Sequence, residues 1–221
     1  MTTSIIVSYD GTTNDDDALA LGRQLTAAGV TLSLAYVRHT REYDLRREEI
    51  GEYDAERRLE QGAVWLEDPD ITRHVVIDPS TSAGLGRLAA TEGAGLVLFG
   101  SDYRTPPGHV EPGGSARGML EGGAVAVGVA QAGLRTHAGE PIRSILVSGD
   151  PGGAAEQTAG SLAAALGAEV VSGGSDADLI LVDSQANAPN GRVALGGATR
   201  ARLDSARGSV IVLPRGAALS F

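Results

Sequence analysis

The chain has 221 residues, 42% of them hydrophobic, which is enough to build a core in one large domain or two small ones. Its formal net charge of −10 excludes a surface built to bind nucleic acid or an anionic membrane, because both partners would repel it. Cysteine is absent, which excludes disulfides and thiolate sites, and all 18 basic residues are arginine, which excludes lysine nucleophiles and the lysine of a phosphate-binding P-loop.

Short apolar runs alternate with helix-like stretches along the first 130 residues. Stretches with helical periodicity and capping residues lie between these runs and predict helices. Strands that alternate with helices are typical of a parallel α/β sheet. The apolar runs that predict buried strands lie at 4–9, 31–37, 73–78, 95–100 and 124–130.

The stretch 41–66 is strongly charged and predicts a long exposed helix, or a helix plus a loop. A charge-rich run of this kind is most often a solvated helix face. Its few large apolar residues are expected to point inward: Leu45, Ile50, Tyr53, Leu59 and Trp65.

Three consecutive aspartates, Asp15 to Asp17, follow Asn14 at the expected start of the first helix. Acidic residues in a first turn interact favourably with the helix dipole, so we expect that role rather than a metal site. The four histidines are scattered without ligand spacing, and we expect no bound metal. The N-terminal residues lack the basic flank and apolar core of a secretory signal, and no apolar run approaches the roughly 20 residues that span a bilayer. We therefore expect a cytoplasmic protein.

Two segments of the chain recur. SILVSGD at 144–150 matches SIIVSYD at 4–10 in five of seven positions, an offset of 140, and residues 96–120 pair without a gap with residues 179–203, an offset of 83. The offsets differ by 57 residues, which matches the charged helix, third strand and third helix of the first copy. The sequence therefore predicts two linked open parallel-sheet domains, at 1–132 and 143–221, joined by a linker at 133–142. The second lacks one helix–strand–helix segment.

Three features resemble the universal stress proteins, the UspA-like family of adenine-nucleotide-binding α/β domains. They are a strand ending in aspartate (IIVSYDG), a strand ending in Gly-Ser (VLFGS), and a loop closing on Gly113 before a helix and a final apolar strand. The resemblance is to a tandem member whose second domain is truncated. It implies a sheet of order 3-2-1-4-5 in a full domain, with a ligand crevice at the carboxyl ends of the first and fourth strands. It also implies that the two halves, or two chains, pair through their last strands, at 127–129 and 210–212.

The resemblance places an adenine nucleotide in the first half, and ATP, with or without magnesium, is the expected ligand. Asp10 and Val37 would face the base. Glycines would let the backbone approach the ribose and phosphates. From the residues alone, Asp10 is as well explained as a turn residue before Gly11, and the paired glycines of the loop as a tight entry into a helix. The residues expected at the phosphate end are Gly100, Arg104, Gly113, Gly114 and Ser115.

The loop departs from the family pattern in ways that bear on phosphate binding. Tyr103 stands where the second glycine of the motif would be, and Gly114 stands at the Ser/Thr position, with the hydroxyl one place later at Ser115. In the second half Asp183 takes the place of the strand-ending glycine. A carboxylate there would repel a phosphate, so we expect no nucleotide in the second half.

The function implied by the resemblance is a cytoplasmic stress-response regulator that senses or carries an adenine nucleotide. We expect at most slow, incidental ATP hydrolysis, because the sequence has no catalytic lysine and no nucleophile elbow. The alternative is a scaffold of the same fold that binds no nucleotide and acts through protein contacts, with Tyr103 filling the crevice. The two domains are expected to form an intramolecular pseudo-dimer, and a homodimer of chains is a further expectation.

Overall fold

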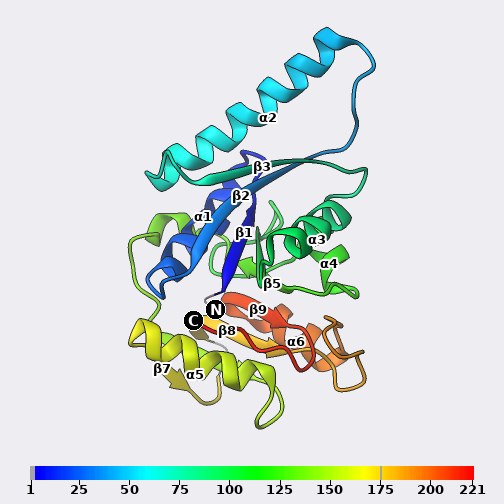
Figure 1. The fold of residues 1–221 in the computed structure, drawn as a ribbon. Coiled ribbons are helices and arrows are strands. Elements are labelled where there is room, and N and C mark those ends of the chain that lie inside the picture. Colours follow the sequence, from blue (N-terminus) through cyan, green and yellow to red (C-terminus); the bar gives the residue numbers. More distant parts are fainter. Residues whose placement is uncertain (1–2, 175) are drawn as a thin grey trace.

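Nine strands form a single sheet in the computed structural model, which describes residues 3–174 and 176–221 (Figure 1). Their order across the sheet is β3-β2-β1-β4-β5-β9-β8-β6-β7. All neighbouring strands run parallel except β5 and β9. The strands are β1 (Ser4–Ser8), β2 (Thr31–Arg38), β3 (Thr72–Ile77), β4 (Leu96–Gly100), β5 (Ala126–Ala130), β6 (Ser144–Ser148), β7 (Glu169–Val171), β8 (Asp176–Asp183) and β9 (Arg207–Leu213).

Helices cover both faces of this sheet and bury two hydrophobic cores, one on each face. Strand side chains alternate between the cores, so that Ile5 and Val7 lie in one and Ile6 in the other. No helix in the described part of the chain combines the length and the apolarity of a membrane-spanning segment. One face carries α1 (Thr13–Thr26), α2 (Leu45–Leu66) and α5 (Ala154–Leu166), and the other carries α3 (Thr81–Glu92), α4 (Gly114–Leu120) and α6 (Gly197–Ser205).

The first five strands have the order 3-2-1-4-5 that the resemblance implied. β5 and β9 pair antiparallel over residues 127–129 and 210–212, which confirms the expected meeting of the two halves at their last strands. The strands of both halves therefore share one sheet. The division into separate domains at 1–132 and 143–221 stays a prediction.

The strands after the linker repeat part of the first half's order. They lie as β9-β8-β6-β7. Matched to the first half by the sequence repeat, this is the 5-4-1-2 part of the same arrangement, without a counterpart of β3 among the described strands. The sheet consequently ends on this side at β7, a strand of only three residues.

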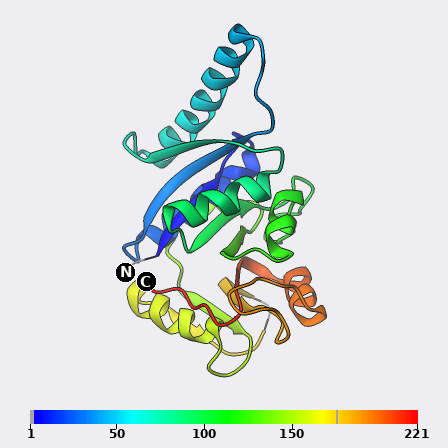
Figure 2. The ribbon, with the colours of Figure 1, turned by 45° about the vertical axis from the view of Figure 1, so that its right-hand side comes forward.

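The inward set expected in the charged helix is wrong for three of its five residues. Leu45, Ile50 and Tyr53 are 80%, 61% and 66% exposed, whereas Leu59 is buried and Trp65 is half-buried against the core. The reason is geometric. Only the C-terminal part of α2 lies on the sheet, whereas its N-terminal turns extend past the β3 edge and are held to the end of β2 by the Arg38–Glu48 ion pair at 2.7 Å (Figures 1 and 2).

Asp17 has a role that the helix-dipole interpretation missed. Its side chain is 1% exposed, and its carboxylate accepts hydrogen bonds from the backbone N–H groups of Gly133 and Arg135 at 2.9 and 2.8 Å. The Arg135 guanidinium donates a third, at 2.8 Å. Asp17 therefore ties the segment after β5, with its short 3-10 helix Leu134–His137, to the start of α1.

Candidate functional site

A cavity of about 410 Å³ opens at the carboxyl ends of β1, β2 and β4. β1 and β4 are neighbours, with β2 on one side of the pair and β5 on the other, so the strand order reverses between them. Open α/β sheets bind ligands in the crevice at such a reversal. The first residues of α3 and α4, Thr81 and Gly114, border the cavity from the far side. Its volume lies in the range of small-molecule sites.

Six of the seven residues predicted to contact a nucleotide line this one cavity. They come from β1, β2, β4 and the start of α4, which are far apart in the sequence. The parallel sheet brings them together because β1, β2 and β4 end, and α4 begins, at the same edge of the sheet. The six are Asp10, Val37, Gly100, Gly113, Gly114 and Ser115.

Arg104, the seventh, does not line the cavity. It is exposed, and its guanidinium lies 4.9 Å from the centre of the Tyr103 ring. Tyr103 is itself 71% exposed and does not line the cavity either. The tyrosine that replaces the motif's second glycine therefore points away from the crevice and leaves it open.

The three glycines of the crevice differ in what their missing side chains do. A Cβ on Gly100 would lie 2.0 Å from the carbonyl oxygen of Asn14, in α1. Gly100 therefore allows β4 and α1 to approach each other, a packing role. A Cβ on Gly113 or Gly114 would meet no atom within 4 Å, so these two glycines face open space. The prediction had placed all three glycines at the phosphates, without this difference.

The end of the crevice beside β1 holds two carboxyl groups. One oxygen of Asp15 accepts hydrogen bonds from the backbone N–H groups of Asp10 and Thr12, at 3.0 and 3.1 Å, and from the Thr12 hydroxyl at 2.8 Å. Burial, together with the neighbouring Asp10 carboxyl, raises the pKa of Asp15 to about 7. Near neutral pH the pair thus carries less negative charge than two free aspartates would, which reduces its repulsion of an anionic ligand.

Sequence reasoning missed several polar residues of the crevice, besides Asp15. Arg58 on α2 donates a hydrogen bond to the Asp10 carbonyl oxygen, and its guanidinium lies 5.5 Å from the centre of the Tyr36 ring. His39 and Thr81 also line the cavity. His39 could have been expected, because it directly follows the carboxyl end of β2. Arg58 could not, because it is one of many arginines in a charged helix.

The matching crevice of the second half is filled by the protein itself. The Asp183 carboxylate accepts hydrogen bonds from the backbone N–H groups of Asp150, at 3.2 Å, and Ala155, at 2.8 Å. Burial raises the pKa of Asp183. A Cβ on Gly149 or Gly153 would lie 2.0 or 2.2 Å from its oxygen, so these glycines make room for the carboxylate. The cavity left there is about 190 Å³.

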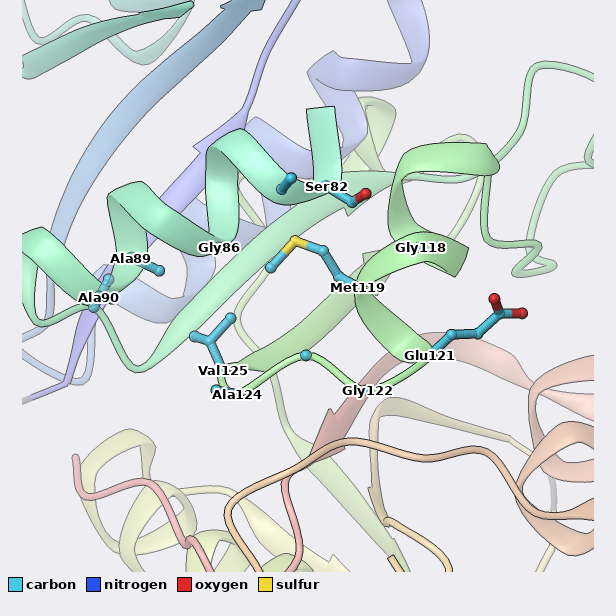
Figure 3. A pocket seen from close by; sticks show the side chains of 13 residues that line it. Ser82, Gly86, Ala89, Ala90, Gly118, Met119, Glu121, Gly122, Ala124 and Val125 are labelled. Atoms are coloured by element: carbon cyan, nitrogen blue, oxygen red, sulfur yellow. The ribbon is translucent and has the colours of Figure 1, made fainter. Parts of the chain in front are cut away.

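A third cavity, of about 330 Å³, lies between α3 and α4, and few polar side chains line it. Its walls are mainly alanines and glycines, with Met119 and Val125 pointing into the space and the Glu121 carboxylate pointing away from it (Figure 3). Across residues 3–174 and 176–221, no group of three or more histidines and acidic residues is placed to hold a metal ion.

Solved structures match the chain over nearly its whole length. A universal stress protein from Archaeoglobus fulgidus DSM 4304 covers 96% of this chain and 98% of its own, with a TM-score of 0.61 and 17% identity. A protein of unknown function from Pseudomonas aeruginosa PAO1 covers 96% and 93%, with a TM-score of 0.57 and 15% identity. A universal stress protein in complex with cAMP covers 43% and 73%, at 20% identity and a TM-score of 0.34, too low to bear on this chain's ligand. No protein-family model and no curated protein matches the chain. Over 96% of its length, the chain has the fold of the universal stress proteins.

Proposed function

We propose that the crevice at β1 and β4 binds an adenine nucleotide, and that the protein acts as a cytoplasmic stress-response regulator which senses or carries it. One observation carries this proposal: six residues expected at a nucleotide from the sequence alone line a single cavity of about 410 Å³ where the strand order reverses. ATP, with or without magnesium, is the proposed ligand.

The two ends of the crevice suit the two ends of a nucleotide. Beside β1 and β2, the Asp10 carboxylate can accept a hydrogen bond from the amino group of adenine, next to Val37. At the other end, Gly113 and Gly114 leave open space and Ser115 offers a hydroxyl. Arg58 places a cation in the cavity wall beside Asp10, where it would offset part of the charge of the Asp10 and Asp15 carboxyl groups.

The crevice is proposed to bind rather than to catalyse. The lining offers two carboxyl groups, of which Asp15 already accepts three hydrogen bonds at one oxygen. Thr81 and Ser115 also line the wall, and neither hydroxyl is hydrogen-bonded to His39, the crevice residue that would be the natural base for them. Hydrolysis of a bound nucleotide would therefore be slow and incidental.

Calorimetry on matched variants tests the nucleotide proposal. ATP is titrated into the wild type, Asp10→Ala and Asp150→Ala, and nucleotide released from the heat-denatured wild type is identified by chromatography. We expect binding that Asp10→Ala weakens about tenfold or more, in line with loss of a hydrogen bond that involves a charged group. Asp150→Ala, the same change at the repeat position in the filled crevice, should bind like the wild type. No heat at millimolar ATP, with no released nucleotide, would refute the proposal.

The second candidate is a scaffold that binds no nucleotide and acts through protein contacts. The observation in its favour is the exposed apolar surface at the start of α2, where Tyr43 precedes the helix and Leu45 is its first residue. The version in which Tyr103 fills the crevice is contradicted by the 71% exposure of that residue. If ATP titration gives no heat while circular dichroism shows an intact fold, the scaffold becomes the better candidate.

A further inference from the structure

The outer face of α2 carries a row of exposed residues at helical spacing. It lies away from the buried face of the same helix, where Ala55, Leu59, Gly62 and Ala63 pack. Residues three or four apart on a helix are neighbours on its surface, so the row is continuous. We call it the α2 stripe; its members, all exposed, are Arg46, Glu49, Ile50, Tyr53, Arg57, Glu60 and Val64.

The middle of the α2 stripe is apolar and unusually exposed. Ile50 is 61% exposed and Tyr53 is 66% exposed, and Val64 near the end of the stripe is 66% exposed. Scattered single apolar residues on a surface need no explanation, but these lie in one row on one helix. The N-terminal turns of α2 extend beyond the sheet in both views (Figures 1 and 2). The Arg38–Glu48 ion pair holds them to β2, while the stripe residues on these turns stay exposed, so a second molecule can reach them.

The charges of the α2 stripe run in an order that complements itself. From the N-terminal end, Arg46 and Glu49 precede Tyr53, and Arg57 and Glu60 follow it. If two α2 helices lie antiparallel with Tyr53 on the twofold axis, Arg46 comes level with Glu60 of the second copy, and Glu49 with Arg57 of the second copy. Each contact occurs twice by symmetry. A parallel pair in register would instead oppose like charges at every level.

The ends of the α2 stripe can make these contacts. Among the described residues, Arg46 and Glu49 have no ion pair or side-chain hydrogen bond. Arg57 has one exposed contact, 3.7 Å from Asp54, which contributes little. Glu60 pairs with Arg73 of β3 and is still 55% exposed.

A groove runs beside the α2 stripe and has room for a helix side chain. It encloses about 550 Å³ between α2 and β3, and its walls include Tyr53, Leu59 and Val75. Val75 is 40% exposed, and β3 is the edge strand of the sheet, with no strand on its outer side among the described residues. The groove is therefore continuous with both the α2 stripe and an unpaired sheet edge.

We propose that the α2 stripe is a self-association surface whose partner is a second copy of this chain, docked with the two α2 helices antiparallel and Tyr53 at the twofold axis. Charge complementarity selects this partner, because the stripe supplies both members of every pair in the required order. The Tyr53 ring of each copy would enter the groove of the other. This contact is separate from the β5–β9 junction, which is already used within the chain.

Sedimentation velocity and light scattering on the full chain test this proposal. We expect a dimer that forms between about 1 and 100 µM, the affinity range of a modest interface. Tyr53→Glu should raise the dimer dissociation constant by at least about tenfold, as for a central aromatic contact. Arg57→Glu should raise it about tenfold, because it opposes Glu49 of the second copy. Glu49→Arg combined with Arg57→Glu restores opposite charges and should return the constant to near the wild-type value.

Control variants separate this surface from others. Glu92→Arg makes the same charge change as Glu49→Arg at an exposed residue of α3 and should leave the dimer unchanged. Circular dichroism should report an intact fold for Tyr53→Glu, since that side chain packs on little within its own chain. Three results would each overturn the proposal: a monomer throughout the concentration range, a dimer that Tyr53→Glu leaves intact, or a double variant as weak as Arg57→Glu alone.

Discussion

Gly100→Ala separates the packing role of a crevice glycine from a ligand-binding role. The added Cβ would lie 2.0 Å from the carbonyl oxygen and 2.6 Å from the carbonyl carbon of Asn14. Both are backbone atoms of α1, so only a separation of β4 from α1 can relieve the contact. Overpacking by a methyl costs about 1–3 kcal/mol, and a backbone neighbour puts this site at the upper end, about 3 kcal/mol. At about 2–4 °C per kcal/mol for a chain of this size, Tm should fall by about 6–12 °C.

Gly114→Ala is the matched control for this experiment. Its Cβ meets no atom within 4 Å, and Gly114 is the first residue of α4, where alanine favours the helix. Gly114→Ala should therefore be as stable as the wild type or up to about 1 kcal/mol more stable. Urea denaturation followed by circular dichroism gives both free energies of unfolding. A Gly100→Ala variant within about 0.5 kcal/mol of the wild type would refute the close-approach reasoning.

Three aspartates give further predictions for stability. Asp15 has a pKa of about 7 in the folded protein against 3.8 for a free aspartate, so between these pH values the folded state binds a proton that the unfolded state has lost. The free energy of unfolding should therefore fall as pH rises from about 4 to 7, by at most about 1.4 kcal/mol per pH unit. Asp15→Asn should flatten this slope in urea denaturation across that pH range, and an unchanged slope would contradict the raised pKa. Asp17→Ala leaves two backbone amides and the Arg135 guanidinium without their acceptor. The Arg135 side chain is 33% exposed and can partly rehydrate, so the free energy of unfolding should fall by about 2–3 kcal/mol rather than by the full cost of a broken buried pair. The fall in Tm measures this loss. Asp183→Ala removes the acceptor for the amide of Asp150 and for that of Ala155 in the first turn of α5, and should cost about 1 kcal/mol, as loss of a capping residue does; equal urea midpoints would exclude that role.

The positions of the strands were predictable because apolar runs are local patterns in the sequence, whereas the strand order was implied by the resemblance to the universal stress proteins. The burial of α2 was not. Periodicity identifies which residues of a helix share a face, but it does not say how far the sheet extends beneath that face. β3 is the last strand on its side, so Leu45, Ile50 and Tyr53 have no sheet to cover. Helical spacing alone predicts that all three are buried.

The crevice was predictable to the extent that its residues follow strands. Asp10, Val37 and Gly100 end or follow parallel strands, and the rule that such ends meet at one edge places them together. Arg58 reaches the crevice from α2, and Asp17 accepts a hydrogen bond from Gly133, 116 residues further along the chain. Neither contact has a local pattern, because both depend on how the helices lie on the finished sheet.

The two halves supply a capping carboxylate from different elements. In the first half it is Asp15, within α1, and β4 ends in Gly100, where a side chain would strike α1. By the repeat offset of 140, the position that matches Asp15 is Ala155, and by the offset of 83 the position that matches Gly100 is Asp183. Asp183 reaches across from β8 to the backbone amide that corresponds to the one bound by Asp15. A single relocation of the carboxylate, from helix to strand end, therefore accounts for both substitutions. It also accounts for part of the difference in size between the two crevices, about 410 Å³ in the first and about 190 Å³ in the second, since the Asp183 side chain lies in the wall of the second crevice.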